Sequence, residues 1–282
     1  PANLAVLNEL AATCSPDVRD AWFEDAQTLA NHDGRYDAVP WDGVVFDAAI
    51  SYDGLLRQQA ANIIALVPPS DLHLVKGSVK VFGVPEPHKK RTRCITHTQA
   101  FNSFYAKDDV AKNRGNALQA DALEDVLGAS GAIHLDIRCY FDFIPQTDDV
   151  SYHECFRAFG STYRRRRLAM GKRSSSSVAT SSTRVLLGFP MPPDVRVRYA
   201  TDGVRFAGSR ANCVSAAWTF VQRALSVGFQ LNEVNASSCS RAAVDALWQT
   251  SDADFLGQLI DYHLKTVRCR QRHVDRVQAF AS

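Results

Sequence analysis

One short run, residues 132 to 145 with the sequence AIHLDIRCYFDFIP, constrains the fold most strongly. Ile133 and Leu135 alternate into Asp136, and a β-prone stretch continues to Pro145, which predicts a buried strand carrying one carboxylate. Burying an ionised aspartate without a partner is costly, so Asp136 is expected to have a cation, a metal or several hydrogen-bond donors beside it. The alternative is an aspartate at the end of a strand that caps the following turn.

The composition indicates a folded protein with a substantial core. The chain has 282 residues, of which 46% are hydrophobic, and this is enough for one large domain or two small ones. No apolar run is long enough to span a membrane and no signal-peptide pattern opens the sequence, so we predict an intracellular protein without membrane contact. The nucleus and the mitochondrion are not distinguished. Seven scattered cysteines without CxxC spacing predict reduced, mostly buried thiols.

Hydrophobic periodicity predicts an α+β fold in which helices and hairpins alternate. Helices are expected at residues 3–14, 16–29, 53–67, 113–127, 152–159, 174–187, from 209 onward, 240–248 and in the basic tail at 270–280. Strands are expected in a hairpin at residues 72–98, at 163–168, in a hairpin at 196–209 and in a hairpin at 255–267. Asp202 and Gly203 are predicted to form the turn of the third of these, as an ordinary type I′ hairpin would.

The positive charge is concentrated locally, since the formal net charge is only +2. Lys89, Lys90 and Arg91 are predicted to lie at the tip of the hairpin at 72–98, either as a phosphate-binding tip or as a solvated turn. Residues 164 to 167 are four consecutive arginines. Side chains alternate along a strand, so Arg164 and Arg166 share one face, which could bind RNA phosphates or acidic protein.

Five segments resemble, in their order, the motifs of reverse transcriptases. Asp136 with an aromatic residue five positions later resembles the first catalytic motif, and RLAMG at 167–171 followed by a small-residue helix resembles the template-side motif. The hairpin carrying Asp202 resembles the catalytic hairpin, residues 85–102 the fingers motif and residues 255–267 the primer grip. The series covers roughly residues 79 to 277. Its residue pattern is most similar to that of retroelements of the tyrosine-recombinase class. The alternative to this resemblance is an unrelated α+β binding domain.

This resemblance implies a palm of antiparallel strands backed by helices, with fingers and a truncated or absent thumb. We divide the chain into an N-terminal helical region (1–71), a fingers-like region (72–131), a palm-like region (132–254) and a primer-grip hairpin with a basic helix (255–282). The implied Mg²⁺ ligands are Asp136 and Asp202, because two-metal polymerase chemistry requires paired carboxylates. The implied nucleotide-binding residues are Lys90, Arg93, Phe141, Met170 and Gly171, and those contacting nucleic acid are Lys89, Arg91, Arg164 and Arg166.

Three departures from the family pattern weaken the expectation of catalysis. Gly203 stands where a second aspartate is usual, Glu233 lies where a lysine commonly follows the GFQLN segment, and few residues remain after the primer grip for a thumb. The expectation is therefore a catalytically degenerate, domesticated reverse-transcriptase-like protein that acts as an RNA-binding or structural subunit of a ribonucleoprotein with other protein subunits. The alternative is an active RNA-directed DNA polymerase of a retroelement, which would act on RNA or an RNA/DNA duplex with Mg²⁺.

Overall fold

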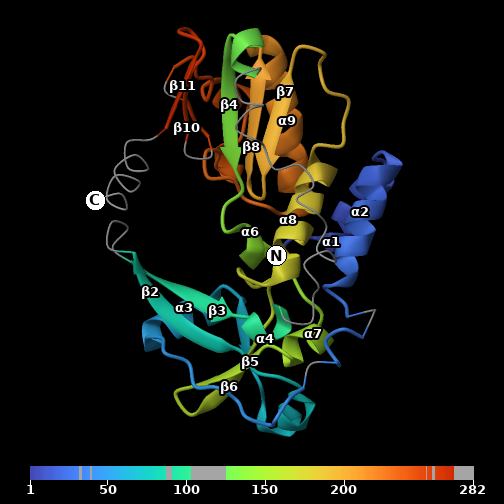
Figure 1. The fold of residues 1–282 in the computed structure, drawn as a ribbon, viewed down its shortest axis with the longest axis vertical. Coiled ribbons are helices and arrows are strands. Elements are labelled where there is room, and N and C mark those ends of the chain that lie inside the picture. Colours follow the sequence, from blue (N-terminus) through green and yellow to red (C-terminus); the bar gives the residue numbers. More distant parts are fainter. Residues whose placement is uncertain are drawn as a thin grey trace, which may run out of the picture. The chain divides into compact units, whose positions relative to one another are not determined.

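A computed structural model describes residues 1–31, 34–38, 40–86, 91–102, 125–251, 253–255 and 258–269 (Figure 1). These residues form a mixed α+β fold with several small antiparallel sheets, which confirms the α+β part of the predicted fold class. The chain divides into two compact units. Unit 1 combines Pro1–Leu4, Pro16–Lys112 and Tyr140–Ser181, whereas unit 2 combines Ala5–Ser15, Asn113–Cys139 and Ser182–Ser282. Each unit thus draws on several of the sequence regions defined above.

Unit 1 contains the sheet β1-β6-β5 and the hairpin β2-β3. The strands are β1 (Ile64–Leu66), β2 (Lys80–Glu86), β3 (Arg91–His97), β5 (Cys155–Ala158) and β6 (Ser161–Arg165). Its helices are α2 (Pro16–Gln27), α3 (Tyr52–Ala60), η1 (Pro69–Leu74), α4 (Gln99–Asn102), α6 (Tyr140–Phe143) and α7 (Asp148–Tyr152). The long helix α8 (Arg173–Leu186) begins in this unit.

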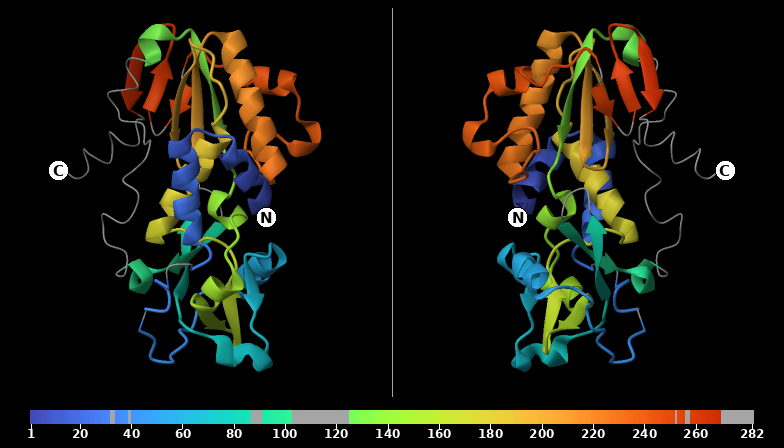
Figure 2. Two further views of the ribbon diagram at one scale, coloured as in Figure 1. Left: turned by 90° about the vertical axis from the view of Figure 1, so that its right-hand side faces the viewer. Right: turned by 90° about the vertical axis from the view of Figure 1, so that its left-hand side faces the viewer.

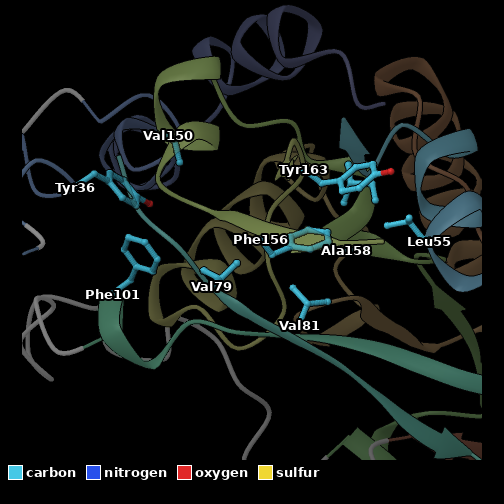
Figure 3. Close-up of a cluster of buried hydrophobic side chains, with 10 residues drawn as sticks. Tyr36, Leu55, Val79, Val81, Phe101, Val150, Phe156, Ala158 and Tyr163 are labelled. Atoms are coloured by element: carbon cyan, nitrogen blue, oxygen red, sulfur yellow. The ribbon is translucent and has the colours of Figure 1, made fainter. Parts of the chain in front are cut away.

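The core of unit 1 forms because the inward faces of these strands are apolar. Val81 lies on β2 and Val79 immediately precedes that strand. Both side chains pack with Phe156 from β5 and Tyr163 from β6 (Figure 3). The two aromatic rings stack with their centroids 5.8 Å apart. Leu55 of α3 is fully buried in the same cluster, so the helix is held on the sheet by its apolar stripe.

Unit 2 is built around the antiparallel sheet β4-β8-β7. The strands are β4 (Gly131–Asp136), β7 (Arg196–Ala200) and β8 (Gly203–Gly208), and the second sheet holds β9 (Ala253–Phe255), β10 (Gln258–Asp261) and β11 (Thr266–Cys269). The helices are α1 (Leu4–Ala12), which begins one residue before this unit, α9 (Arg210–Val227), η3 (Ala236–Ser238) and α10 (Arg241–Asp245).

Figure 2 shows α9 along one face of the β4-β8-β7 sheet and the small sheet β9-β10-β11 on the other side. Val204 and Phe206 of β8 are completely buried, and the ring of Phe206 lies 5.9 Å from that of Phe220 on α9. On the opposite face, Ala132 and Ala207 pack with Phe255 and residues of β10. Both faces of the central sheet are therefore covered, apart from its Asp136 end.

Several predicted elements agree with the structure. The hairpins formed by β2-β3 and β7-β8, and the helices α1, α2, α8, α9 and α10, fall within predicted ranges or within a residue of them. The β10-β11 hairpin ends at Cys269, two residues beyond the predicted range. The predicted helix at 113–127 and the basic tail at 270–280 lie largely or wholly outside the described residues. Cys155 and Cys213 are buried, as predicted for most of the thiols, whereas Cys139 is exposed.

Three predictions were wrong. The run at 132–145 is not one strand, since β4 ends at Asp136, Cys139 adopts a left-handed φ of 48°, and α6 follows. Residues 152–159 are not a helix, because α7 ends at Tyr152 and β5 begins at Cys155. The predicted helix at 53–67 stops at Ala60, after which β1 begins at Ile64. No helix among the described residues is long and apolar enough to cross a membrane.

Candidate catalytic and nucleic-acid-binding site

Asp136 lies at the end of β4, and Asp202 lies in the turn just before the neighbouring strand β8 of the central sheet of unit 2. Asp136 ends β4 and pairs with Gly203 of β8, and the Ile137 N–H donates to the Asp202 carbonyl oxygen at 2.9 Å. Opposed Cα atoms in antiparallel strands lie about 4.5 to 5.5 Å apart and successive Cα atoms about 3.8 Å. The two aspartates are therefore closer than about 10 Å, as the palm interpretation requires.

The turn beside this pair is displaced by one residue from its predicted position. Ala200 pairs with Gly203, so the two turn residues are Thr201 and Asp202, and Thr201 has a left-handed φ of 51°. Gly203 is instead the first residue of β8, and its φ lies outside the left-handed region. Because directly opposed residues project to the same face, position 203 is the one whose side chain would stand beside Asp136. In this protein that position has no side chain.

Two residues after α9 hold Asp136 in place, and sequence analysis did not assign either of them to the site. Asn232 donates from Nδ2 to Asp136 Oδ2 at 2.6 Å, and the Asn232 N–H donates to the Asp136 carbonyl oxygen at 2.9 Å. The Asp136 N–H donates to Glu233 Oε2 at 2.9 Å. Two features of the sequence pointed to this segment: the GFQLN run that ends at Asn232 and the apolar Leu231, which pairs with Ile137.

The pKa values of Asp136, Asp202 and Glu233 are all raised above their ordinary values. Burial raises the pKa of Asp136, against the opposing effect of the Asn232 hydrogen bond. Burial also raises the pKa of Asp202, and the charge of Asp136 raises it further. Partial burial is likewise the main cause that raises the pKa of Glu233, although this residue is exposed as a whole. Among the described residues, no cation is one of the groups that shift these pKa values, so no positive side chain offsets the negative charge of the ionised cluster.

The other titratable groups on this face do not compensate that charge. His134, two residues before Asp136, has its pKa lowered to about 3 by burial and then by Arg205, so it is neutral at ordinary pH. Arg205 is buried and donates to Asp125, at 2.5 Å between Nη2 and Oδ2. A cation from outside this set would therefore be favoured at the Asp136 end of the sheet.

The acidic pair fits one hard cation better than two. Carboxylate oxygens are the ligands that Mg²⁺ prefers, and Mg²⁺ commonly uses one or two of them together with water. Among the described residues, no group of three or more His, Cys, Asp or Glu side chains is arranged to hold a metal. Asp136 and Asp202 would hold such an ion, which would offset the Asp136 charge that raises the pKa of Asp202.

Replacing Asp202 with asparagine is expected to stabilise the protein slightly at neutral pH without divalent cations. An acid whose native pKa is raised weakens the folded state at high pH, and that penalty fades as pH falls toward the unfolded value near 4. We expect a gain of roughly 0.2 to 1 kcal/mol at pH 7 that shrinks as pH is lowered. Urea denaturation over this range measures it, with Asp53→Asn, an exposed acid paired with Arg57, as control. A variant less stable than the parent at pH 7 contradicts the account.

The predicted nucleotide-binding residues of unit 1 form a separate group. Arg93 on β3 donates from Nη1 to the sulfur of Met170 at 4.0 Å, and Gly171 follows with a φ of 98° that favours glycine. Asn102 joins the two segments through hydrogen bonds. Its Nδ2 donates to the Gly171 carbonyl oxygen at 2.9 Å, and its Oδ1 accepts from the Arg173 N–H at 2.7 Å. One amide side chain thus brings together the two segments that resemble the fingers and template-side motifs.

The remaining predicted residues are placed as follows. Phe141 lies half-buried in α6 of unit 1. Lys89 and Lys90 fall outside the described residues, and Arg91 is the first residue of β3. The roles proposed for these four residues stay predictions.

The four arginines alternate as predicted, but they have intramolecular partners. Arg165 and Arg167 are buried, and Arg165 Nη2 donates to Asp142 at 3.0 Å. On the other face, Arg164 donates to Asp148 at 2.5 Å and lies over the ring of Tyr152, while Arg166 donates to Asn62 at 2.7 Å. These hydrogen bonds within the protein indicate structural roles for Arg164, Arg165 and Arg166. They give no support to phosphate binding by Arg164.

Comparison with known proteins places this chain in no family. No protein-family model matches it, and no curated protein matches its sequence. The interpretation of the two residue groups therefore rests on their own geometry and chemistry.

Proposed function

We propose that this chain is a reverse-transcriptase-like protein that binds RNA, as a subunit of a ribonucleoprotein with other proteins, and adds nucleotides very slowly or not at all. The register that sets Gly203 opposite Asp136 carries this proposal. A polymerase site needs two metal ions to stabilise both the attacking and the leaving oxygen. With a glycine at that position, the acidic pair supports one ion at most.

The group around Arg93, Met170 and Gly171 supports the family interpretation independently of the acidic pair. Its members come from segments about seventy residues apart in the sequence, and Asn102 joins them through two hydrogen bonds. In the sequence, Lys89, Lys90 and Arg91 come shortly before Arg93, and such positive residues suit phosphate, which supplies most of the sequence-independent affinity of RNA-binding proteins.

One observation favours the alternative, an active RNA-directed DNA polymerase of a retroelement. Glu233 brings a third carboxylate to the backbone of Asp136, which the sequence motifs did not include. In the structure, Glu233 Oε2 accepts the Asp136 N–H, so that oxygen is already engaged. We therefore retain RNA binding without efficient turnover as the better-supported function.

The RNA-binding half of the proposal predicts the behaviour of a double variant, Lys89→Ala with Lys90→Ala. We expect weaker binding to all RNA sequences alike, with the log–log salt dependence reduced by about one unit for each lost phosphate contact. Fluorescence anisotropy with labelled RNA at several salt concentrations measures both quantities. Lys76→Ala is the matched control, because Lys76 donates to Asp149 at 2.7 Å. A double variant with the parent's affinity and salt dependence would show that Lys89 and Lys90 do not contact RNA phosphates.

A further inference from the structure

The outward face of the β2-β3 hairpin combines apolar and positive side chains. The register pairs Lys80 with His97, Phe82 with Ile95 and Val84 with Arg93. Directly opposed residues share a face of the sheet, so these six side chains lie together. The opposite face carries Val81 and Thr96, which are 3% and 7% exposed and belong to the interior. The six-residue set therefore faces outward.

Two large apolar side chains on this face are exposed to solvent. Phe82 is 37% exposed and Val84 is 41% exposed. A third, Phe46, is 39% exposed and lies at the edge of the hairpin, where Lys80 Nζ is 5.3 Å from its ring centroid. An apolar patch rimmed by polar residues typically marks a binding surface.

The positive side chains on this face indicate which class of ligand it can bind. Lys80 and Arg93 are positive, and Arg93 pairs with the acidic Glu86 at 3.5 Å between Nη2 and Oε1. The chain then continues toward Lys89, Lys90 and Arg91, so the face and the sequence that extends it carry excess positive charge. An apolar protein or lipid tail would gain nothing from these cations, whereas an anionic polymer with aromatic groups matches both features.

We infer that this face binds single-stranded RNA by stacking a base on Phe82, with Lys80 and Arg93 beside the phosphates. Proteins that bind single strands combine aromatic platforms with a positively charged surface. In a duplex the base faces are stacked on one another, so an aromatic side chain on a sheet cannot reach them. This inference rests on the proposed RNA-binding function and specifies its ligand as unpaired RNA.

A matched pair of variants tests the inference. Phe82→Ala should weaken binding of a short fluorescein-labelled oligouridine about tenfold, whereas Phe82→Tyr should retain most of the affinity. Leu72→Ala removes an equally exposed apolar side chain of unit 1, on η1, and should change affinity less than about twofold. Binding of the same strand in an RNA duplex should be weaker in the parent and insensitive to Phe82→Ala. Melting temperatures of all variants establish that each is folded.

Each outcome has a distinct meaning. If the parent binds no RNA, both the proposed function and this inference fail. If the parent binds oligouridine and Phe82→Ala binds it equally well, only the stacking face is wrong. Equal affinity for the single strand and the duplex would also overturn the inference, because stacking on Phe82 requires an unpaired base.

Discussion

Replacing Lys172 with methionine is expected to destabilise unit 1 by about 3 to 5 kcal/mol. Lys172 and Glu154 are both completely buried, and Nζ donates to Glu154 Oε1 at 2.8 Å and to Gln146 Oε1 at 3.0 Å. Nζ also lies 4.4 Å from the ring centroid of Tyr36. Removing the ammonium group leaves a carboxylate buried without its partner. Since whole domains are stable by only about 5 to 15 kcal/mol, this loss is large.

Thermal and urea denaturation of matched variants measure this effect. Lys76→Met removes the same group from the exposed pair with Asp149, and it should cost no more than about 1 kcal/mol. The double variant Lys172→Met with Glu154→Leu should be more stable than Lys172→Met alone, because both charges are then gone. A Lys172→Met protein as stable as the Lys76→Met control would show that the buried pair does not hold the interior of unit 1 together.

Gly131→Ala is expected to destabilise unit 2 by roughly 1 to 3 kcal/mol. A Cβ atom at this first residue of β4 would lie 2.6 Å from the Gln249 carbonyl oxygen and would also overlap the indole ring of Trp248. The neighbouring backbone cannot move away easily. Ala132 and Gln249 exchange two hydrogen bonds of 2.8 and 2.9 Å at this point.

Gly128 provides the control for the same substitution three residues earlier. It belongs to the helical residues 125–128, and a Cβ atom there would meet nothing within 4 Å. Gly128→Ala should therefore stabilise the protein by about 0.4 to 1 kcal/mol, through the entropy of the unfolded chain. Urea denaturation that gives the two variants shifts of the same sign would contradict the packing described for the start of β4.

The sequence predicted the central hairpin well because its burial pattern determines the register. Val204 and Phe206 must both face α9, and a shift by one residue would turn them outward. That constraint outweighs the local preference of Asp202 and Gly203 for a type I′ turn, so Thr201 takes the left-handed conformation instead. Turn chemistry alone therefore located the hairpin but placed its turn one residue late.

The contacts made by distant segments could not be predicted from local patterns. Asn232 and Glu233 approach Asp136 from almost a hundred residues away, and neither lies in a motif that indicates such a role. Lys172 follows a glycine and precedes a serine-rich helix, which is typical of an exposed residue, yet it is buried by its pairing with Glu154. The prediction of one strand over residues 132–145 was wrong for a related reason, because β propensity depends strongly on tertiary context.

Position 203 offers a way to restore the missing carboxylate. A Cβ atom there would lie 3.8 Å from a Phe255 ring carbon and 3.9 Å from the Ala200 carbonyl oxygen, which are ordinary contacts. Gly203→Asp should therefore fold, and its carboxylate would share a face with Asp136. Any primer extension that this variant gains over the parent would assign the loss of activity to this residue.

The most direct measurement is primer extension by the unmodified protein on an RNA template with Mg²⁺ or Mn²⁺, alongside RNA binding by the same preparation. The account predicts that the protein binds RNA and that extension is absent or very slow, because the acidic pair supports at most one metal ion. Asp136→Asn should then bind RNA like the parent. Robust extension by the parent that is lost in Asp136→Asn would contradict the account and identify the chain as an active polymerase.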